Sequence, residues 1–180
     1  MSGSDFYDAG PLQQIAINLF YGWGYNFYRK ENQLRADDQL VRSQAAWLLG
    51  LAHASLDDAE QAHRRANLPA PSREHPFPDA AAVEAVRTLE RLSKAVGALI
   101  GRLHALPAPE NDRMTQRHRG EAETLTALGA CDERLIGQSE LLRSSLVGKE
   151  PQWVLENASF VVEGVAAIEE TLRQRQAILT

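Results

Sequence analysis

The chain of 180 residues is long enough for one domain with a substantial core, and its single cysteine excludes an intrachain disulfide. Its net charge of −5 argues against nucleic acid as the main partner, because phosphate binding requires a basic face. Asp5 and Asp8 lie where a signal peptide would carry positive charge, and the longest apolar-looking run, residues 15–27, is too short and too polar to span a bilayer. We therefore expect a cytoplasmic protein without a transmembrane segment.

Residues 15–28, IAINLFYGWGYNFY, form the most aromatic stretch of the chain. Apolar residues recur there both at alternate positions, as in a half-buried strand, and at helical spacing. We favour a short helix followed by an irregular turn at Gly22 and Gly24, because the chain has no second strand candidate to pair with the first. The aromatic side chains either pack over one end of the later helices or contact another subunit or partner. A membrane-surface anchor would need a basic face, which this segment lacks.

Mixed charges follow directly over residues 29–42. Arg35, Asp38 and Arg42 have the spacing of a salt-bridge ladder, and a solvated helix start is the simplest interpretation. If the aromatic segment is a contact surface, these charges extend it. The candidate partner-binding residues are Tyr21, Trp23, Tyr25, Phe27, Tyr28, Arg29, Arg35, Asp38 and Arg42.

The first long helix is expected over residues 35–66. Its predicted inner face consists of Leu40, Trp47, Leu48, Leu51, Ser55, Ala59 and Ala62. With that face inward, His53, Asp57 and Glu60 point away from the core. Glu60 and His63 match one Glu-x-x-His pair of a di-iron bundle, but the chain contains no second pair. His53 also lacks the lysine and glycine that usually follow a phosphotransfer histidine, so neither pattern predicts a site.

A proline-rich connector over residues 67–78 ends this helix, because each proline removes a donor and fixes φ. Asp79 suits the N-cap of a second helix over residues 79–106. Apolar or small residues recur along this helix in steps of four and three, as bundle packing requires. They are Ala82, Val86, Leu89, Ser93, Val96, Ile100 and Leu103.

The third helix is expected over residues 110–147, which no proline interrupts, and would be about 57 Å long. Its apolar seam is Met114, Ala122, Leu125, Leu128, Leu135, Leu142 and Leu146, interspersed with the polar residues His118, Glu121, Asp132 and Ser139. A buried carboxylate must be hydrogen-bonded, paired or protonated. Asp132 therefore either pairs with an arginine or tryptophan of another helix or faces a ligand. The candidate ligand or metal residues are His118, Glu121 and Asp132.

Gly148 and Pro151 mark the next break, and a fourth helix is expected over residues 151–178. Its seam is Val154, Ala158, Val161, Val165, Ile168 and Leu172. Four long helices joined by short connections predict an all-α protein. We expect an up-down-up-down four-helix bundle over residues 35–180, preceded by an aromatic N-terminal arm over residues 1–34.

Two functions from different classes fit these features. The first is a non-enzymatic accessory or adaptor protein that acts through protein–protein contacts of its aromatic arm, as a monomer or a homodimer. The alternative is an all-α bundle that binds a small molecule, metal or cofactor, or an enzyme, with the polar residues of the third helix at its site. The sequence contains no nucleophile elbow, P-loop or zinc-protease motif. We therefore favour the first function and predict no cofactor.

Overall fold

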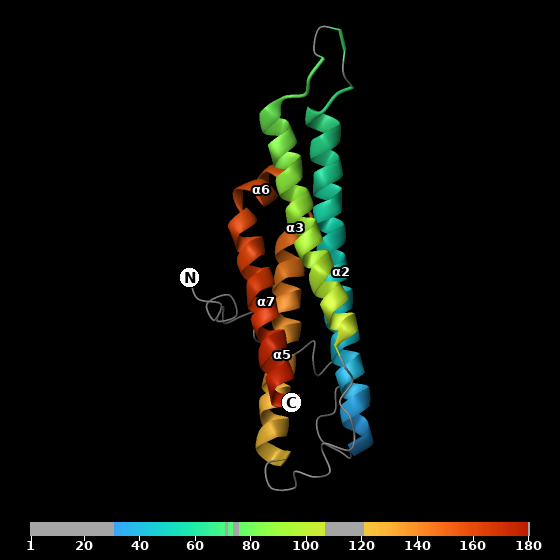
Figure 1. Cartoon of the computed structure of the whole chain (residues 1–180), viewed down its shortest axis with the longest axis vertical. Helices are drawn as coiled ribbons and strands as arrows, with labels where there is room; N and C mark the ends of the chain where they lie inside the picture. The colour runs from blue at the N-terminus through green and yellow to red at the C-terminus, as the bar shows by residue number, and fades with distance from the viewer. Residues whose placement is uncertain (1–30, 71, 74–75, 107–120, 180) are drawn as a thin grey trace.

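The computed structural model describes residues 31–70, 72–73, 76–106 and 121–179, with their side chains except at residues 31–38, 121–126 and 179. This part of the chain is helical and contains no strand, so the all-α prediction is confirmed (Figure 1). The helices are α2 (Glu31–Asn67), α3 (Ala80–Ala105), α5 (Glu121–Leu146), α6 (Pro151–Glu156) and α7 (Ala158–Leu179). None of the described helices is long and apolar enough to cross a membrane.

The helices α2 and α3 form an antiparallel hairpin. Near one end, Arg64 Nη2 of α2 lies 2.9 Å from Glu90 Oε1 of α3. At the other end, Arg42 Nη1 donates to the Leu106 carbonyl at 2.6 Å. Asp79 begins α3 as predicted, because its Oδ2 accepts a hydrogen bond from the Ala82 N–H at 2.9 Å.

The second pair, α5 and α7, is also antiparallel, since Asp132 contacts Arg175 while Gln138 contacts Thr171. The two pairs pack together through α2 against α5 and through α3 against α7 (Figure 1). The short helix α6 packs on α2 and α3. Aliphatic side chains from each of the five helices in the described part of the chain fill the core enclosed by these contacts.

A break divides the helix that the sequence predicted over residues 151–178. Asn157 lies between α6 and α7 with φ −108° and ψ 23°. Its side-chain Nδ2 donates to the Trp153 carbonyl at 2.8 Å, and its own carbonyl accepts from the Phe160 N–H at 3.0 Å. An asparagine side chain competes in this way with regular helical bonding, which explains why the helix is interrupted here. Pro151 occupies the first turn of α6 as expected.

The buried face of α2 differs from the predicted one. Trp47 is 56% exposed and Leu51 is 37% exposed, although both were assigned to the inner face. The residues that face the core are Val41, Ala45, Ala46, Leu48, Leu49, Ala52, Leu56 and Ala59. This helix packs against both α3 and α5, so it buries a broad face on which alanines allow close approach. The large tryptophan dominates the sequence pattern but lies outside that face.

The middle of α5 is the most completely buried stretch described in this helix. Every residue from Leu135 to Leu142 is buried, and these positions span more than two helical turns. The helix is therefore covered on all its faces in this stretch. The predicted start of this helix at residue 110 lies outside the described residues, because residues 107–120 are not among them.

Candidate functional site

A buried ion pair in the described core joins α5 to α7. Arg175 Nε lies 2.5 Å from Asp132 Oδ1, and each side chain is only 2% exposed. A buried carboxylate is stable in its charged form when a hydrogen-bonded cation compensates for lost hydration. Arg175 supplies that cation. Of the two alternatives predicted for Asp132, the geometry therefore agrees with an internal salt bridge to an arginine of another helix.

Two further buried polar contacts continue this interface along α5. Thr171 Oγ1 lies 2.9 Å from Gln138 Oε1, and Ser139 Oγ donates to the Leu135 carbonyl at 2.8 Å. Polar groups in a core favour the alignment in which each finds its partner. The contacts Asp132–Arg175 and Gln138–Thr171 therefore define how α5 and α7 are aligned along their length.

Burial also controls the acidity of the two residues beside Asp132. It raises the pKa of the Cys131 thiol; the charge of Arg134 opposes this effect and the charge of Asp132 adds to it, both less strongly than burial. Burial likewise raises the pKa of the Glu133 carboxyl. A thiol held in its protonated form is a poor nucleophile, so Cys131 is not an activated cysteine.

Most of the other predicted site residues fall outside the described part of the chain. This holds for His118, for the side chain of Glu121, and for the six aromatic-arm candidates Tyr21, Trp23, Tyr25, Phe27, Tyr28 and Arg29. Arg35 and Asp38 belong to α2, but their side chains are not described. Arg42 is described, and it binds the C-terminal end of α3 through the Leu106 carbonyl. Among the described residues, no three His, Cys, Asp or Glu side chains are grouped to hold a metal ion.

A polar cluster that the sequence pattern did not predict lies between α2 and α3. His53 Nδ1 lies 3.1 Å from Asp57 Oδ2, and Ser93 Oγ lies 3.1 Å from His53 Nε2. Ser93 also donates to Asp57 Oδ1 at 2.5 Å. The prediction that His53 and Asp57 point away from the core is therefore wrong: they lie at the edge of the α2–α3 contact. The prediction was wrong because the buried face of α2 was assigned incorrectly. The i, i+4 spacing of His53 and Asp57 was the sequence feature that could have indicated their contact.

This cluster has the residue types of a Ser-His-Asp triad but not its chemistry. In a triad, the serine proton is passed to the histidine, and the carboxylate holds the other ring nitrogen. Here the Ser93 proton points to Asp57, and the serine is only 6% exposed in the middle of α3. The arrangement therefore joins two helices rather than activating a nucleophile.

An uncharged stripe runs along the outer face of α2. Between Arg42 and Asp57 this helix contains no acidic residue, lysine or arginine. Trp47 and Leu51 lie one turn apart on the stripe, and Ser43 and Ala54 extend it at either end. Single exposed apolar residues are common, but a stripe without charges is typical of a contact surface.

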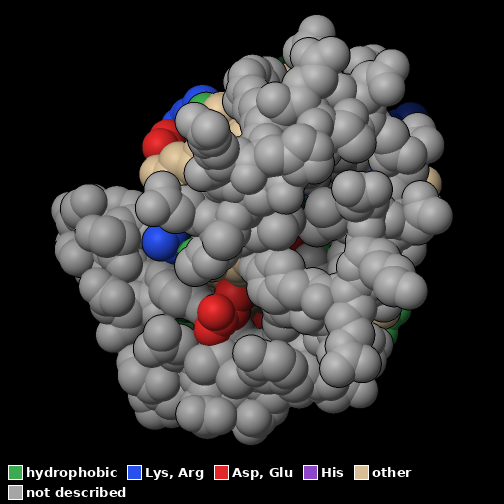
Figure 2. All heavy atoms as spheres, turned by 90° about the horizontal axis from the view of Figure 1, so that it is seen from below, with side chains coloured by type: hydrophobic (Ala, Val, Ile, Leu, Met, Phe, Trp, Pro, Cys, Tyr) green, Lys and Arg blue, Asp and Glu red, His purple; other side chains and the backbone are tan. Residues whose placement is uncertain are grey.

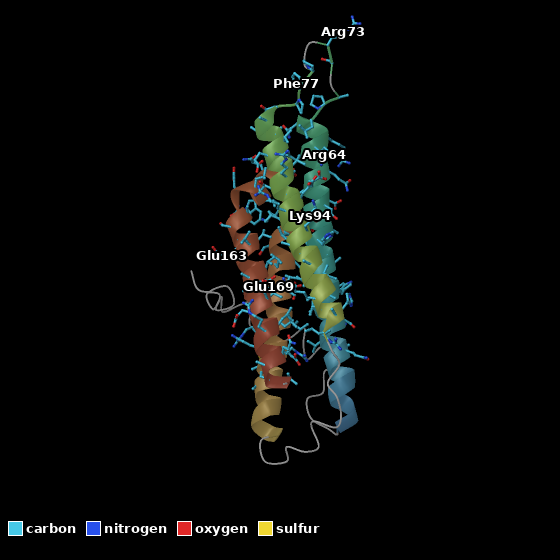
Figure 3. The ribbon with its side chains drawn as sticks, viewed as in Figure 1. Arg64, Arg73, Phe77, Lys94, Glu163 and Glu169 are labelled. Carbon is cyan, nitrogen blue, oxygen red and sulfur yellow. The ribbon has the colours of Figure 1, made fainter. Side chains whose placement is uncertain are left out.

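Elsewhere the described surface is mixed in charge. The view along the long axis in Figure 2 shows both acidic and basic side chains among the described residues. Along the α2–α3 hairpin, Arg64 and Lys94 each lie beside Glu90 (Figure 3). Surface charges of both signs are therefore interspersed there, which contrasts with the uncharged stripe of α2.

Comparison of the chain with protein-family models, with curated proteins and with solved structures found no match.

Proposed function

We propose that this chain is a non-enzymatic accessory or adaptor protein that acts in the cytoplasm through protein–protein contacts. Its framework is an up-down-up-down four-helix bundle, and its contact surface is the aromatic arm of residues 1–34. The partner is another protein or a second copy of the chain. This proposal accounts for the concentration of aromatic residues ahead of the helices that form the core.

The observation that carries the proposal is the uncharged stripe on α2. Trp47 and Leu51 are exposed on the helix that directly follows the aromatic arm in the chain. A tryptophan buries a large area at low conformational cost, and interfaces are enriched in it. We therefore extend the proposed contact surface from the arm to the outer face of α2.

The alternative, a ligand-binding bundle or enzyme with His118, Glu121 and Asp132 at its site, loses support from the described geometry. Asp132 is nearly inaccessible and is already bound by Arg175. A ligand would have to displace an internal salt bridge, which leaves a buried charge without compensation. The core contact between α5 and α7 is therefore better explained by stability than by ligand binding.

The test compares three variants of the full chain by native mass spectrometry and partner capture. Trp23→Ala combined with Phe27→Ala alters the arm, and Trp47→Ser alters the stripe of α2. Phe77→Ala is the matched control. Phe77 is 85% exposed, but it lies between α2 and α3, at the end of the hairpin far from the start of α2 (Figure 3). We expect the first two variants to lose self-association or partner binding while remaining folded, and the control to retain it. Unchanged binding in the folded arm variant would rule the proposal out.

A further inference from the structure

The outer face of α2 is exposed along several helical turns. The exposed residues on it are Ser43, Trp47, Leu51, Ala54 and, one turn further, Asp58. At about 100° per residue these positions share one side of the helix, opposite the side that faces the core. The helices α3 and α5 pack on the other sides of α2. This face therefore stays open to solvent in a single copy of the described chain.

Small residues lie beside the tryptophan of this face. A Cβ atom added at Gly50 would meet no atom within 4 Å, so packing within the chain does not require a glycine there. Glycine in the middle of a helix lowers stability relative to alanine. The close approach of a second helix accounts for such a glycine, and Ala54, one turn later, leaves room on the same side.

The face is complementary in size to a second copy of itself when the two helices run in opposite directions. With a two-fold axis midway between Gly50 and Leu51, Trp47 of one copy lies level with Ala54 of the other. Gly50 of the two copies face each other at the axis. The largest side chain of the face thus packs against its smallest ones, as the interlocking of two helix surfaces requires.

Charge also favours the antiparallel orientation. In a parallel pair, Asp58 would oppose Asp58 and Trp47 would oppose Trp47, so like charges and bulky side chains would meet. In the antiparallel pair, Asp58 of one copy lies level with Ser43 of the other, whose hydroxyl can donate to the carboxylate. The two Asp58 carboxylates are then about 22 Å apart, at 1.5 Å per residue along the helix. This exceeds the Debye length of about 8 Å at physiological salt, so their repulsion is screened.

We propose that a second copy of this chain binds the outer face of α2 with its own α2, the two helices antiparallel and Gly50 at the two-fold axis. This rests on the proposed function in taking the uncharged stripe as a contact surface, and it names the partner there as a second copy. A contact that uses the same surface on both copies closes on itself, so the assembly is a dimer. The paired stretch is short, and we therefore expect the stripe alone to give a readily reversible dimer.

The first test introduces a charge at the axis. Gly50→Glu places two carboxylates side by side in the dimer, whereas the single chain has room for the side chain. Gly101→Glu, at an exposed glycine of α3 with no atom nearby, is the matched control. Sedimentation equilibrium of the full chain measures self-association, and circular dichroism checks folding. We expect Gly50→Glu to weaken self-association at least about tenfold and Gly101→Glu to leave it unchanged. An unmodified protein that is monomeric at every concentration, or a dimer that folded Gly50→Glu leaves unchanged, overturns the proposal.

Disulfide formation tests the orientation and does not depend on the folding of Gly50→Glu. Mild oxidation should link Gly50→Cys to itself at least about tenfold faster than the control Gly101→Cys, because the dimer holds the two thiols close together. Ser43→Cys should link to Asp58→Cys in a mixture but not to itself. The native Cys131 is buried, and the unmodified protein serves as the blank. Self-linking of Ser43→Cys, or equal rates at the two glycine positions, contradicts the antiparallel dimer.

Failure of this dimer and failure of the proposed function give different results. If Trp23→Ala/Phe27→Ala abolishes binding while Gly50→Glu leaves it unchanged, the α2 pairing is wrong and the function of the arm stands. If Gly50→Glu dissociates the dimer while the arm variant retains all binding, the α2 pairing stands and the arm is not the contact surface.

Discussion

At the scale of single residues, Asp132 is a charge placed inside the core. Its cost of burial is compensated by Arg175, which belongs to a helix distant in sequence. A salt bridge of this kind adds little net stability compared with apolar residues of the same shape, yet breaking it leaves an uncompensated charge. We therefore expect the pair to act mainly on helix alignment rather than on net stability.

Replacing Asp132 by asparagine should lower the free energy of unfolding by about 3–5 kcal/mol, because Arg175 would stay buried without its counter-charge. Chemical denaturation measures this loss. Glu170→Gln is the matched control on α7: this exposed carboxyl is bonded by Arg173, which lowers its pKa, and its loss should change stability little. A similar small change for Asp132→Asn would show that the pair is not a structural charge pair.

The thiol of Cys131 should be unreactive in the folded protein. Burial raises its pKa, so the nucleophilic thiolate is scarce at neutral pH, and the side chain is also shielded by the core. With an aromatic disulfide reagent at about pH 8, we expect a rate at least about tenfold below that of the unfolded chain. An equal rate in the folded state would mean that this part of α5 opens to solvent readily.

At the scale of the helices, α3 provides a comparison of two glycines one turn apart. An alanine at Gly101 would meet no atom within 4 Å, whereas one at Gly97 would press on His53. Gly101→Ala should therefore raise the free energy of unfolding by up to about 1 kcal/mol, the usual helix-propensity gain over glycine. Gly97→Ala should gain less or lose stability. Thermal or chemical unfolding measures both, and equal gains would show that His53 does not depend on Gly97.

The helix seams illustrate what sequence patterns determine. On α3, α5 and α7 the described positions of the predicted seams are buried or partly buried; Leu89, Leu135 and Ile168 are examples. On α3 this agrees with one regular stripe that faces the neighbouring helices. On α2 the prediction was right for Leu48 and Ala59 but wrong for Trp47 and Leu51, because Ala45, Ala46 and Ala52 take part in the core face and carry less weight in a hydrophobic pattern than a tryptophan. The cluster of His53 and Ser93 was missed for the same reason. Its members are far apart in sequence and meet only once the two helices are correctly rotated.

At the scale of the whole molecule, two antiparallel helix pairs enclose one aliphatic core, and the long helix α5 is covered on every face in its middle. The class of fold could be predicted from helical spacing and from the prolines that separate the helices. The partner of Asp132 could be predicted only as a type of residue. Its identity as Arg175 required the alignment of α5 with α7, which local sequence patterns do not specify.

The central claim is that the chain works by contacting another protein. Native mass spectrometry of the untagged protein isolated from its own host tests this most directly, together with the Trp23→Ala/Phe27→Ala variant prepared in the same way. We predict a discrete homodimer or a stoichiometric complex for the unmodified protein and a monomer for the variant. A monomeric unmodified protein that carries a small-molecule or metal mass would contradict this account and point to the interior of the bundle instead.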